Sequence, residues 1–239
     1  MIRLIKLRVA SKRMIVLRNN IAKKAKEQYD FGQCVAALDT LQQAIYFGDL
    51  PSRAHMAWIL LGFRGVASNY AKAFELVKEG SYLGCFQCQG VLAYCHLNGL
   101  GCTNDAVIAH QLALGSYTEG SPYGQYALAS TYNRTGYDVQ SIIILLLAAV
   151  QNLADAQNSL GLMNSFGLGI AQDHTKALMW YTLAANQGHT IAILNVAHYY
   201  EVGIGVAVNK KEAKRWYLLG KAAGCTIATR QLDNLDISA

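Results

Sequence analysis

Four cysteines lie close together in the sequence, and two of them form a Cys-x-x-Cys motif at Cys85 and Cys88. Cys95 and Cys102 follow the motif, and His96 stands directly after Cys95. Thiolate and imidazole groups at such spacings can bind zinc, and two neighbouring thiols can form a disulfide or supply a nucleophile. A zinc or thiol enzyme around Cys85 and Cys88 is therefore one hypothesis. Buried thiols are the simpler interpretation, because free cysteine is a common core residue.

The other residues whose side chains could take part in a reaction form no recognisable catalytic motif. The six histidines are scattered without a His-Glu-x-x-His motif, and the 15 acidic residues stand singly. Three Gly-x-Gly sequences, which begin at Gly99, Gly167 and Gly203, resemble fragments of phosphate-binding loops. A dinucleotide-binding loop follows a β-strand, however, whereas these glycines recur at one place in a repeat. We therefore expect no catalytic residue, no metal and no cofactor.

These glycines belong to an internal repeat, which is the strongest pattern in the sequence. Gly167-Leu168-Gly169-Ile170 is matched 36 residues later by Gly203-Ile204-Gly205-Val206. The same shift places Trp180-Tyr181 over Trp216-Tyr217. Similar shifts extend the pattern to about six units, which start near residues 17, 52, 86, 122, 154 and 190. The fourth unit is four residues shorter, in the loop between its two halves.

Each unit contains two stretches of about 12 to 15 residues with small or apolar residues at helical spacing. Asp173 stands at an N-cap position and Gly188 at a helix end, so each unit is expected to be a helical hairpin. One hairpin cannot bury its apolar face alone, so stacked hairpins must bury one another. The sequence predicts an all-α solenoid, a tetratricopeptide-like right-handed superhelix of about six helix-turn-helix repeats. Residues 1–16 form a basic arm, 17–225 the repeats and 226–239 a capping segment.

The fifth unit resembles the Sel1-like repeat (SLR) family. The resemblance rests on Ala156, Leu160-Gly161, Gly167-Leu168-Gly169, Asp173, Lys176-Ala177, Trp180-Tyr181, Ala184-Ala185 and Gln187-Gly188. It is dense in the fifth and sixth units, moderate in the third and fourth, and weak in the first two. The family resemblance implies adaptors that gather partners into complexes, and it implies no catalytic residues.

The surface left by the repeats is the expected site of binding. In tetratricopeptide-like stacks the first helix of each unit lines the concave face, where residues vary while the core positions stay fixed. Simple solvent exposure is the alternative explanation of these variable positions. The residues expected to contact a partner are Tyr94, Tyr126, Asn158, His198 and Tyr199.

The basic residues are concentrated at the N-terminal end. Nine cations precede the first acid, Glu27, and the formal net charge of the whole chain is +6. Three explanations stay open: a mitochondrial presequence, an arm that docks on nucleic acid or an acidic protein surface, and a solvated leader that covers the first hairpin. The residues expected to carry the docking are Arg3, Lys6, Arg8, Lys12, Arg13 and Arg18.

The composition limits the remaining choices. The longest apolar run, from Ile142 to Val150, is far below the roughly 18 to 20 residues of a membrane-spanning helix, so we expect no such span. Six sparse cysteines without a preceding secretory signal favour a reducing, intracellular compartment, with mitochondria as an alternative. The favoured function is a non-catalytic scaffold for protein partners in a complex. A solenoid that binds a polyanion or a glycan through its basic arm and tyrosines is the alternative.

Overall fold

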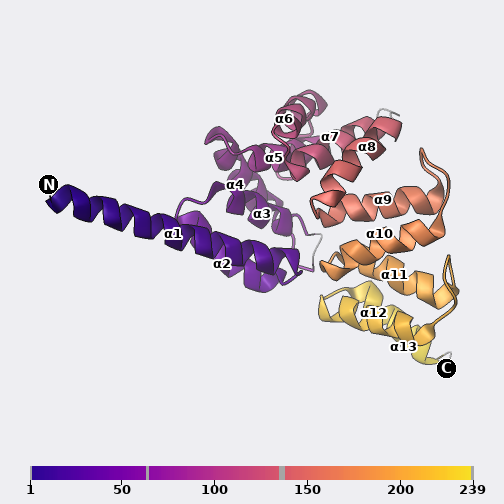
Figure 1. Cartoon of the computed structure of the whole chain (residues 1–239). Helices are drawn as coiled ribbons and strands as arrows, with labels where there is room; N and C mark the ends of the chain where they lie inside the picture. Colours follow the sequence, from indigo (N-terminus) through magenta and orange to yellow (C-terminus); the bar gives the residue numbers. More distant parts are fainter. Residues whose placement is uncertain (1, 63–64, 135–137, 238–239) are drawn as a thin grey trace.

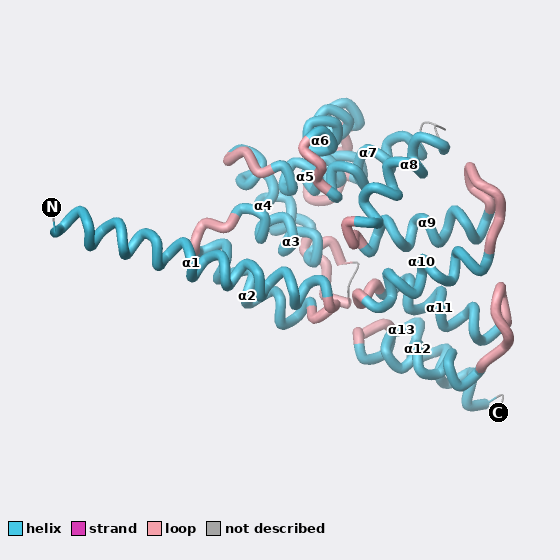
Figure 2. Tube along the Cα trace, in the orientation of Figure 1, coloured by secondary structure: helices cyan, strands magenta, loops and turns pink. Residues whose placement is uncertain are grey.

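The computed structural model describes the backbone of residues 2–62, 65–134 and 138–237, and the side chains from residue 12 onwards except those of residues 138, 236 and 237. Within these ranges the chain forms thirteen α-helices and no strand, which confirms the all-α prediction (Figures 1 and 2). The helices are α1 (Ile2–Asp30), α2 (Cys34–Tyr46), α3 (Leu50–Leu60), α4 (Tyr70–Tyr82), α5 (Phe86–Asn98), α6 (Ala106–Thr118), α7 (Pro122–Arg134), α8 (Asp138–Val150), α9 (Ala154–Phe166), α10 (His174–Asn186), α11 (Thr190–Val202), α12 (Lys210–Ala222) and α13 (Thr226–Ile237).

Consecutive helices pair into hairpins that follow the predicted repeat. The first helices of the second to sixth units begin at residues 50, 86, 122, 154 and 190, within two residues of the predicted starts. Three residues separate α7 from α8, whereas seven separate α9 from α10, so the fourth unit does have the shorter loop. The repeat period alone therefore located these hairpins.

Helix ends are set by residues that recur at one place in the repeat. The Asp173 carboxylate accepts the backbone N–H of Lys176 at 2.9 Å and caps α10, as predicted. Gly167 ends α9 with a left-handed backbone (φ +69°), a conformation that costs an L-residue energy. Asn209 and Gly203 have the same roles in the sixth unit. Each chain segment therefore stops and reverses at a defined turn.

Small residues and aromatic rings fill the space where helices cross. Ala156, Ala177 and Ala184 are fully buried and let the backbones approach closely. Tyr181 is also buried and lies over Gly161, where a Cβ atom would come within 2.5 Å of the ring. A side chain at Gly161 would therefore push neighbouring helices apart.

The N-terminal end of the chain is one long helix that projects from the stacked hairpins (Figure 1). Helix α1 runs without a break across residue 16, so no change in backbone marks the predicted boundary between the arm and the first repeat. Its C-terminal part is anchored, because Ala25 and Tyr29 are buried. The division of the chain into arm, repeats and capping segment stays a prediction.

Units that are distant in the sequence meet at their turns. The loop between α1 and α2 lies against the turn before α11, where a Cβ atom on Gly32 would come within 2.6 Å of Gln187 O (Figure 1). A Cβ atom on Gly65, in the loop after α3, would likewise overlap Ala223 O in the turn before α13. Turns of the first two hairpins therefore contact the turns on either side of the last hairpin.

Candidate functional site

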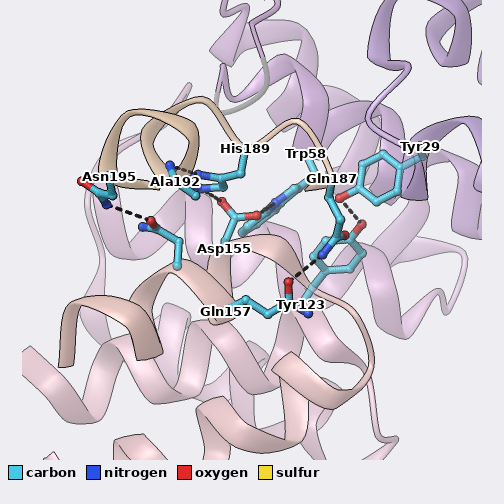
Figure 3. Close-up of polar contacts among 10 residues, drawn as sticks. Tyr29, Trp58, Tyr123, Asp155, Gln157, Gln187, His189, Ala192 and Asn195 are labelled. Carbon is cyan, nitrogen blue, oxygen red and sulfur yellow. Dashed lines mark hydrogen bonds and ion pairs between the residues drawn. The ribbon is translucent and has the colours of Figure 1, made fainter. Parts of the chain in front are cut away.

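A buried tryptophan and a buried aspartate join the second and fifth units. Trp58 of α3 is 0% exposed and Asp155 of α9 is 3% exposed. Trp58 Nε1 donates a hydrogen bond of 2.6 Å to Asp155 Oδ2 across 97 residues of sequence (Figure 3). Such donors are needed here, because burying an unpaired carboxylate costs several kcal/mol.

The second oxygen of Asp155 faces His189, which directly precedes α11. His189 Nε2 lies 3.4 Å from Asp155 Oδ1, and both side chains are 3% exposed. The other ring nitrogen, Nδ1, accepts the backbone N–H of Ala192 at 3.2 Å and caps α11. Nδ1 therefore carries no proton, and the ring proton on Nε2 faces Asp155. Because both nitrogens are engaged, His189 is placed for structure rather than for proton transfer to a substrate. We call Trp58, Asp155 and His189 the junction cluster.

Amide side chains extend the junction cluster between the fifth and sixth units. Gln187 Nε2 donates to Gln157 Oε1 at 2.7 Å (Figure 3). Gln157 Nε2 in turn donates to the backbone oxygen of Ala149 at 3.1 Å. Asn195 Nδ2 lies 3.4 Å from Asn158 Oδ1. These bonds fix the first helices of the last two units relative to each other.

Aromatic rings extend the junction cluster in the other direction. The ring of Trp58 has its centroid 5.0 Å from those of Tyr94 and Tyr123, and 5.7 Å from that of Tyr126. Burial, with the neighbouring phenol and Asp155, raises the pKa of Tyr94, and burial raises that of Tyr126. Both phenols are therefore neutral hydrogen-bonding groups at pH 7. The inner side of the first four units is partly filled by the chain's own rings.

His55 lies between Tyr29 of α1 and Tyr123 of α7. The two ring contacts have centroid distances of 5.0 Å and 5.9 Å, and His55 Nδ1 donates to Pro51 O at 2.9 Å. Burial and then the charge of Lys26 lower the pKa of His55 to about 4. The ring is therefore neutral at pH 7 and belongs to the packing between the first, second and fourth units.

A cavity of about 330 Å³ opens beside Tyr29, His55 and Tyr123. Lys26 and Asp30 stand at its wall and form an ion pair of 2.5 Å with each other. This pairing neutralises both charges, so the wall offers no net charge that would select an ionic ligand. We assign no ligand to the cavity.

Two of the predicted contact residues share one repeat position. Tyr94, Ser130, Leu162 and His198 are equivalent residues of the first helices of units three to six, and we call them the first-helix strip. The side chains of Tyr94, Ser130 and Leu162 are half-buried and that of His198 is exposed. His198 is therefore the exposed residue of the strip, and the other three are partly exposed.

The other three predicted contact residues are half-buried or buried. Tyr126 is half-buried, Asn158 is 7% exposed and Tyr199 is 4% exposed. The Tyr199 hydroxyl donates to Ser165 Oγ at 2.7 Å, and its ring packs edge-on against Tyr181. Tyr199 therefore faces the core between two units, because it follows the exposed His198 by one helical position. The contact role of all five residues stays a prediction.

The basic residues of α1 are described from Lys12 onwards. Lys12 and Arg13 are exposed and Arg18 is half-exposed, on the part of the helix that projects from the hairpins. The side chains of Arg3, Lys6 and Arg8 lie outside the described residues. None of the described helices is both long and apolar enough to cross a membrane.

All six cysteines lie in described parts of the chain, and none is joined in a disulfide. Cys85, Cys88 and Cys95 are buried, whereas Cys102 is half-buried. Among the described residues, no three histidine, cysteine, aspartate or glutamate side chains come together as metal ligands. Cys102 Sγ and His96 Nδ1 lie 3.7 Å apart, as a pair only.

A model of the Sel1 repeat matches the chain at residues 54–85, 87–114, 154–189 and 190–225. These segments cover more than half of the sequence. The chain belongs to the Sel1 repeat family. Proteins built of Sel1 repeats are in general non-catalytic scaffolds for protein interactions. The matched segments are the second, third, fifth and sixth hairpins, so the family pattern skips the first and fourth.

Two curated proteins match parts of this chain and are longer than it. Chitin synthase regulatory factor 3 of Schizosaccharomyces pombe is 30% identical over 135 residues, which is 52% of this chain and 14% of that protein. The putative Sel1-like repeat-containing protein L21 of Acanthamoeba polyphaga mimivirus is 49% identical over 45 residues, which is 19% of this chain and 8% of that protein. The chain therefore spans a small part of either relative.

Solved Sel1-repeat structures share the fold. The antigen c5321 of uropathogenic Escherichia coli, which has an SLR fold, matches 90% of this chain and 50% of its own at a TM-score of 0.56 and 23% identity. A Sel1 repeat protein from Oxalobacter formigenes matches 76% of this chain and 72% of its own at a TM-score of 0.55 and 24% identity. At such identities the likeness shows the fold alone.

The junction cluster was not predicted from the sequence, although Asp155 differs in type from the residues at the same position of the other repeats. The equivalent positions of the other units hold Pro51, Gln87, Tyr123 and Ile191. Asp155 is therefore the acidic residue among the five residues at this repeat position. An acidic residue in the first turn of a helix is also common on protein surfaces, because its negative charge interacts favourably with the helix dipole. Its partner Trp58 could not be found from the repeat period, since the two residues are nearly three units apart.

Proposed function

We propose that this chain is an adaptor that holds a protein partner on its first-helix strip. The carrying observation is that Tyr94, Ser130, Leu162 and His198 are side chains of four different types at one repeat position, of which His198 is exposed and the other three are partly exposed. Variation at an accessible position, on helices whose core positions repeat, suits recognition of one particular partner surface. The regulatory name of the Schizosaccharomyces pombe relative agrees with a role in binding.

The junction cluster supports the proposal through rigidity. Binding surfaces that are held in place before the partner arrives lose less conformational entropy on association. Asp155 fixes α9 against α3 and the turn before α11, and so supports the helix that carries Leu162. Asn195 and Asn158 add a contact between α11 and α9. The strip is therefore presented on helices that are tied together across the stack.

The test compares two charge-neutral double variants. Ser130→Arg with His198→Glu changes the first-helix strip, and Gln111→Arg with Gln140→Glu changes exposed residues of α6 and α8. Each tagged protein is used to capture partners from the native source, followed by quantitative mass spectrometry. We expect the strip variant to lose partners that the wild type and the α6/α8 variant retain. Retention of the same partners by the strip variant would refute the proposed surface.

The exposed cations of α1 favour a second candidate function, binding of a polyanion. Lys12, Arg13, Lys23 and Lys24 are exposed on a helix that projects from the hairpins. Clustered cations bind nucleic acid or another polyanion in a salt-dependent way. Neutralising Lys12, Arg13 and Lys23 with glutamine should lower the salt concentration at which the protein elutes from heparin.

The control for this second function lies in the last repeat. Lys210, Lys211 and Lys214 of α12 are exposed cations of the same number. Replacing them with glutamine removes the same charge from another place, so we expect a smaller change in elution. Equal effects of the two triple variants would show that net charge, and not α1, controls retention.

A further inference from the structure

The Cys-x-x-Cys motif lies at the start of α5, with one thiol at the helix cap. Cys85 is the N-cap residue, and its Sγ accepts the backbone N–H of Cys88 at 3.4 Å. Cys85 Sγ also lies 3.5 Å from Gln87 Oε1. Both thiols therefore meet within the first turn of one helix.

The two thiols have different surroundings. Cys88 is 0% exposed, and its thiol donates to Leu50 O at 3.6 Å, at the start of α3. It fills the space above Gly80 of α4, where a Cβ atom would come within 2.4 Å of Cys88 Sγ. Cys85 is also buried, but it stands between the exposed Gly84 and the exposed Phe86. Cys85 is thus the thiol nearer to the surface.

The same difference appears in the acidity of the thiols. The interaction with the Cys88 side chain, together with the backbone N–H groups of Cys88 and Gln87, lowers the pKa of Cys85 to about 7 against the opposing effect of burial. The interaction with Cys85 and burial raise the pKa of Cys88. Burial raises the pKa of Cys95 to about 12. Cys85 is therefore the more acidic thiol of the pair, and a substantial fraction of it is ionised near neutral pH.

The repeat provides an internal comparison for this pair. Cys225 occupies the repeat position of Cys85, directly before α13, and Ala228 occupies the position of Cys88. Gly220 takes the place of Gly80, and a Cβ atom there would lie 2.8 Å from Ala228 Cβ. Cys225 is half-exposed, so it is the more accessible thiol. The chain thus contains one helix-start cysteine with a second thiol in place and one without.

We propose that Cys85 and Cys88 are an oxidisable dithiol, which a small-molecule disulfide such as oxidised glutathione converts into an intramolecular disulfide. The Cys85 thiolate attacks one sulfur of the small disulfide, forms a mixed disulfide and releases one thiolate. Cys88 then loses its proton, attacks Cys85 Sγ and releases the second thiolate. The protein loses two protons and two electrons, and the small disulfide becomes two thiols.

Oxidation would also change how α5 is held. Cys88 without its proton cannot donate to Leu50 O, and a disulfide sulfur is a weaker acceptor for the Cys88 N–H than a thiolate is. The new covalent loop encloses two residues, so it restricts the unfolded chain little. We therefore expect the oxidised protein to have a lower melting temperature than the reduced protein.

The experiment maps the disulfide in the folded full-length chain. The protein is equilibrated with oxidised glutathione at pH 7.5, remaining thiols are blocked by alkylation, and the product is digested with chymotrypsin. Cleavage after Phe86 places Cys85 and Cys88 on separate peptides, which stay together only through their disulfide. We expect this linked pair to form, while Cys225 carries a glutathione adduct or the alkyl label.

Cys88→Ala tests the role of the second thiol. This variant copies the arrangement of Cys225 and Ala228, and alanine fits the space beside Gly80. We expect Cys85 of the variant to hold glutathione as a stable mixed disulfide, which the wild type resolves. The proposal fails if wild-type Cys85 and Cys88 are both fully alkylated after treatment that modifies Cys225. It also fails if Cys85 keeps its glutathione adduct in the wild type as in Cys88→Ala.

Discussion

Contacts between neighbouring hairpins and contacts across the junction hold this molecule together in different ways. Neighbouring hairpins meet through small residues and rings, such as the ring of Tyr181 in the fifth unit against that of Tyr199 in the sixth. The junction instead joins the second and fifth units through a buried carboxylate, the Trp58 indole and the His189 imidazole. Apolar contacts tolerate the replacement of one apolar residue by another of similar size. A buried charge instead needs hydrogen-bond donors at particular places.

The difference shows which contacts can give one repeat protein a shape that its relatives do not share. Stacking defines a solenoid of any length, because each unit contacts only its neighbours. The contact between Trp58 and Asp155 adds a constraint between units that are not neighbours, and so selects one curvature. The turns at Gly32 and Gly65 contact the turns on either side of the last hairpin, in agreement with this constraint. The following predictions test whether the junction is the stronger determinant.

The largest effect is expected from Asp155→Ala. The change leaves the Trp58 and His189 N–H groups buried opposite an apolar side chain, so we expect a loss of about 3–5 kcal/mol in the free energy of unfolding. Asp173→Ala, in the same hairpin, removes a helix cap and should cost about 1 kcal/mol. Urea unfolding of both variants measures the two values. Equal losses would show that the junction is no more important than one cap.

Acid should weaken the packing around His55. Its pKa is about 4 in the folded protein and near the ordinary value of 6.5 when unfolded, so the unfolded state binds the proton more readily between these values. Stability is therefore full above pH 6.5, and about 2 to 3 kcal/mol is lost as the pH falls to about 4. His55→Gln should flatten this dependence.

His198→Gln is the matched control for the pH experiment, because His198 is exposed on the first-helix strip. Urea unfolding of both variants and the wild type at pH values between 4 and 7 gives the slope of the free energy of unfolding against pH for each protein. A slope that His55→Gln leaves unchanged would assign the pH dependence to another group.

A smaller effect is expected when single hydrogen bonds are removed from the two kinds of contact. Trp58→Phe keeps a ring but removes the donor to Asp155, which should cost about 2 kcal/mol because the acceptor is charged. Tyr199→Phe removes a neutral bond to Ser165 between neighbouring units and should cost about 1 kcal/mol. Unfolding midpoints compare the two changes. A larger cost for Tyr199→Phe would reverse the proposed ranking.

Much of the fold could be predicted because it is local. The 36-residue shift, Asp173 and Gly167 act within one hairpin or between neighbours, and the helix starts at 86, 122, 154 and 190 coincide with the predicted ones. The start of the first unit near residue 17 stays a prediction, because α1 passes without a break across this point. Local signals therefore predict elements where they recur in every unit.

The candidate site was predicted less completely for a physical reason. His198 is exposed as the first-helix position suggested, but the neighbouring Tyr199 turns into the core, and the helical period alone did not separate them. The contact of Trp58 with Asp155 depends on the curvature accumulated over three hairpins. Small changes in each crossing angle add up over this distance, so no pattern within a single repeat specifies the pair.

The most direct test of the junction is the indole N–H spectrum of the folded protein. The chain has three tryptophans, Trp58, Trp180 and Trp216, so each indole signal can be assigned by substitution. We expect the Trp58 N–H to exchange slowly with solvent and to shift in Asp155→Asn, while the signals of Trp180 and Trp216 stay in place. A Trp58 N–H that exchanges as fast as that of Trp180, or that ignores Asp155→Asn, would contradict a direct bond between the second and fifth units.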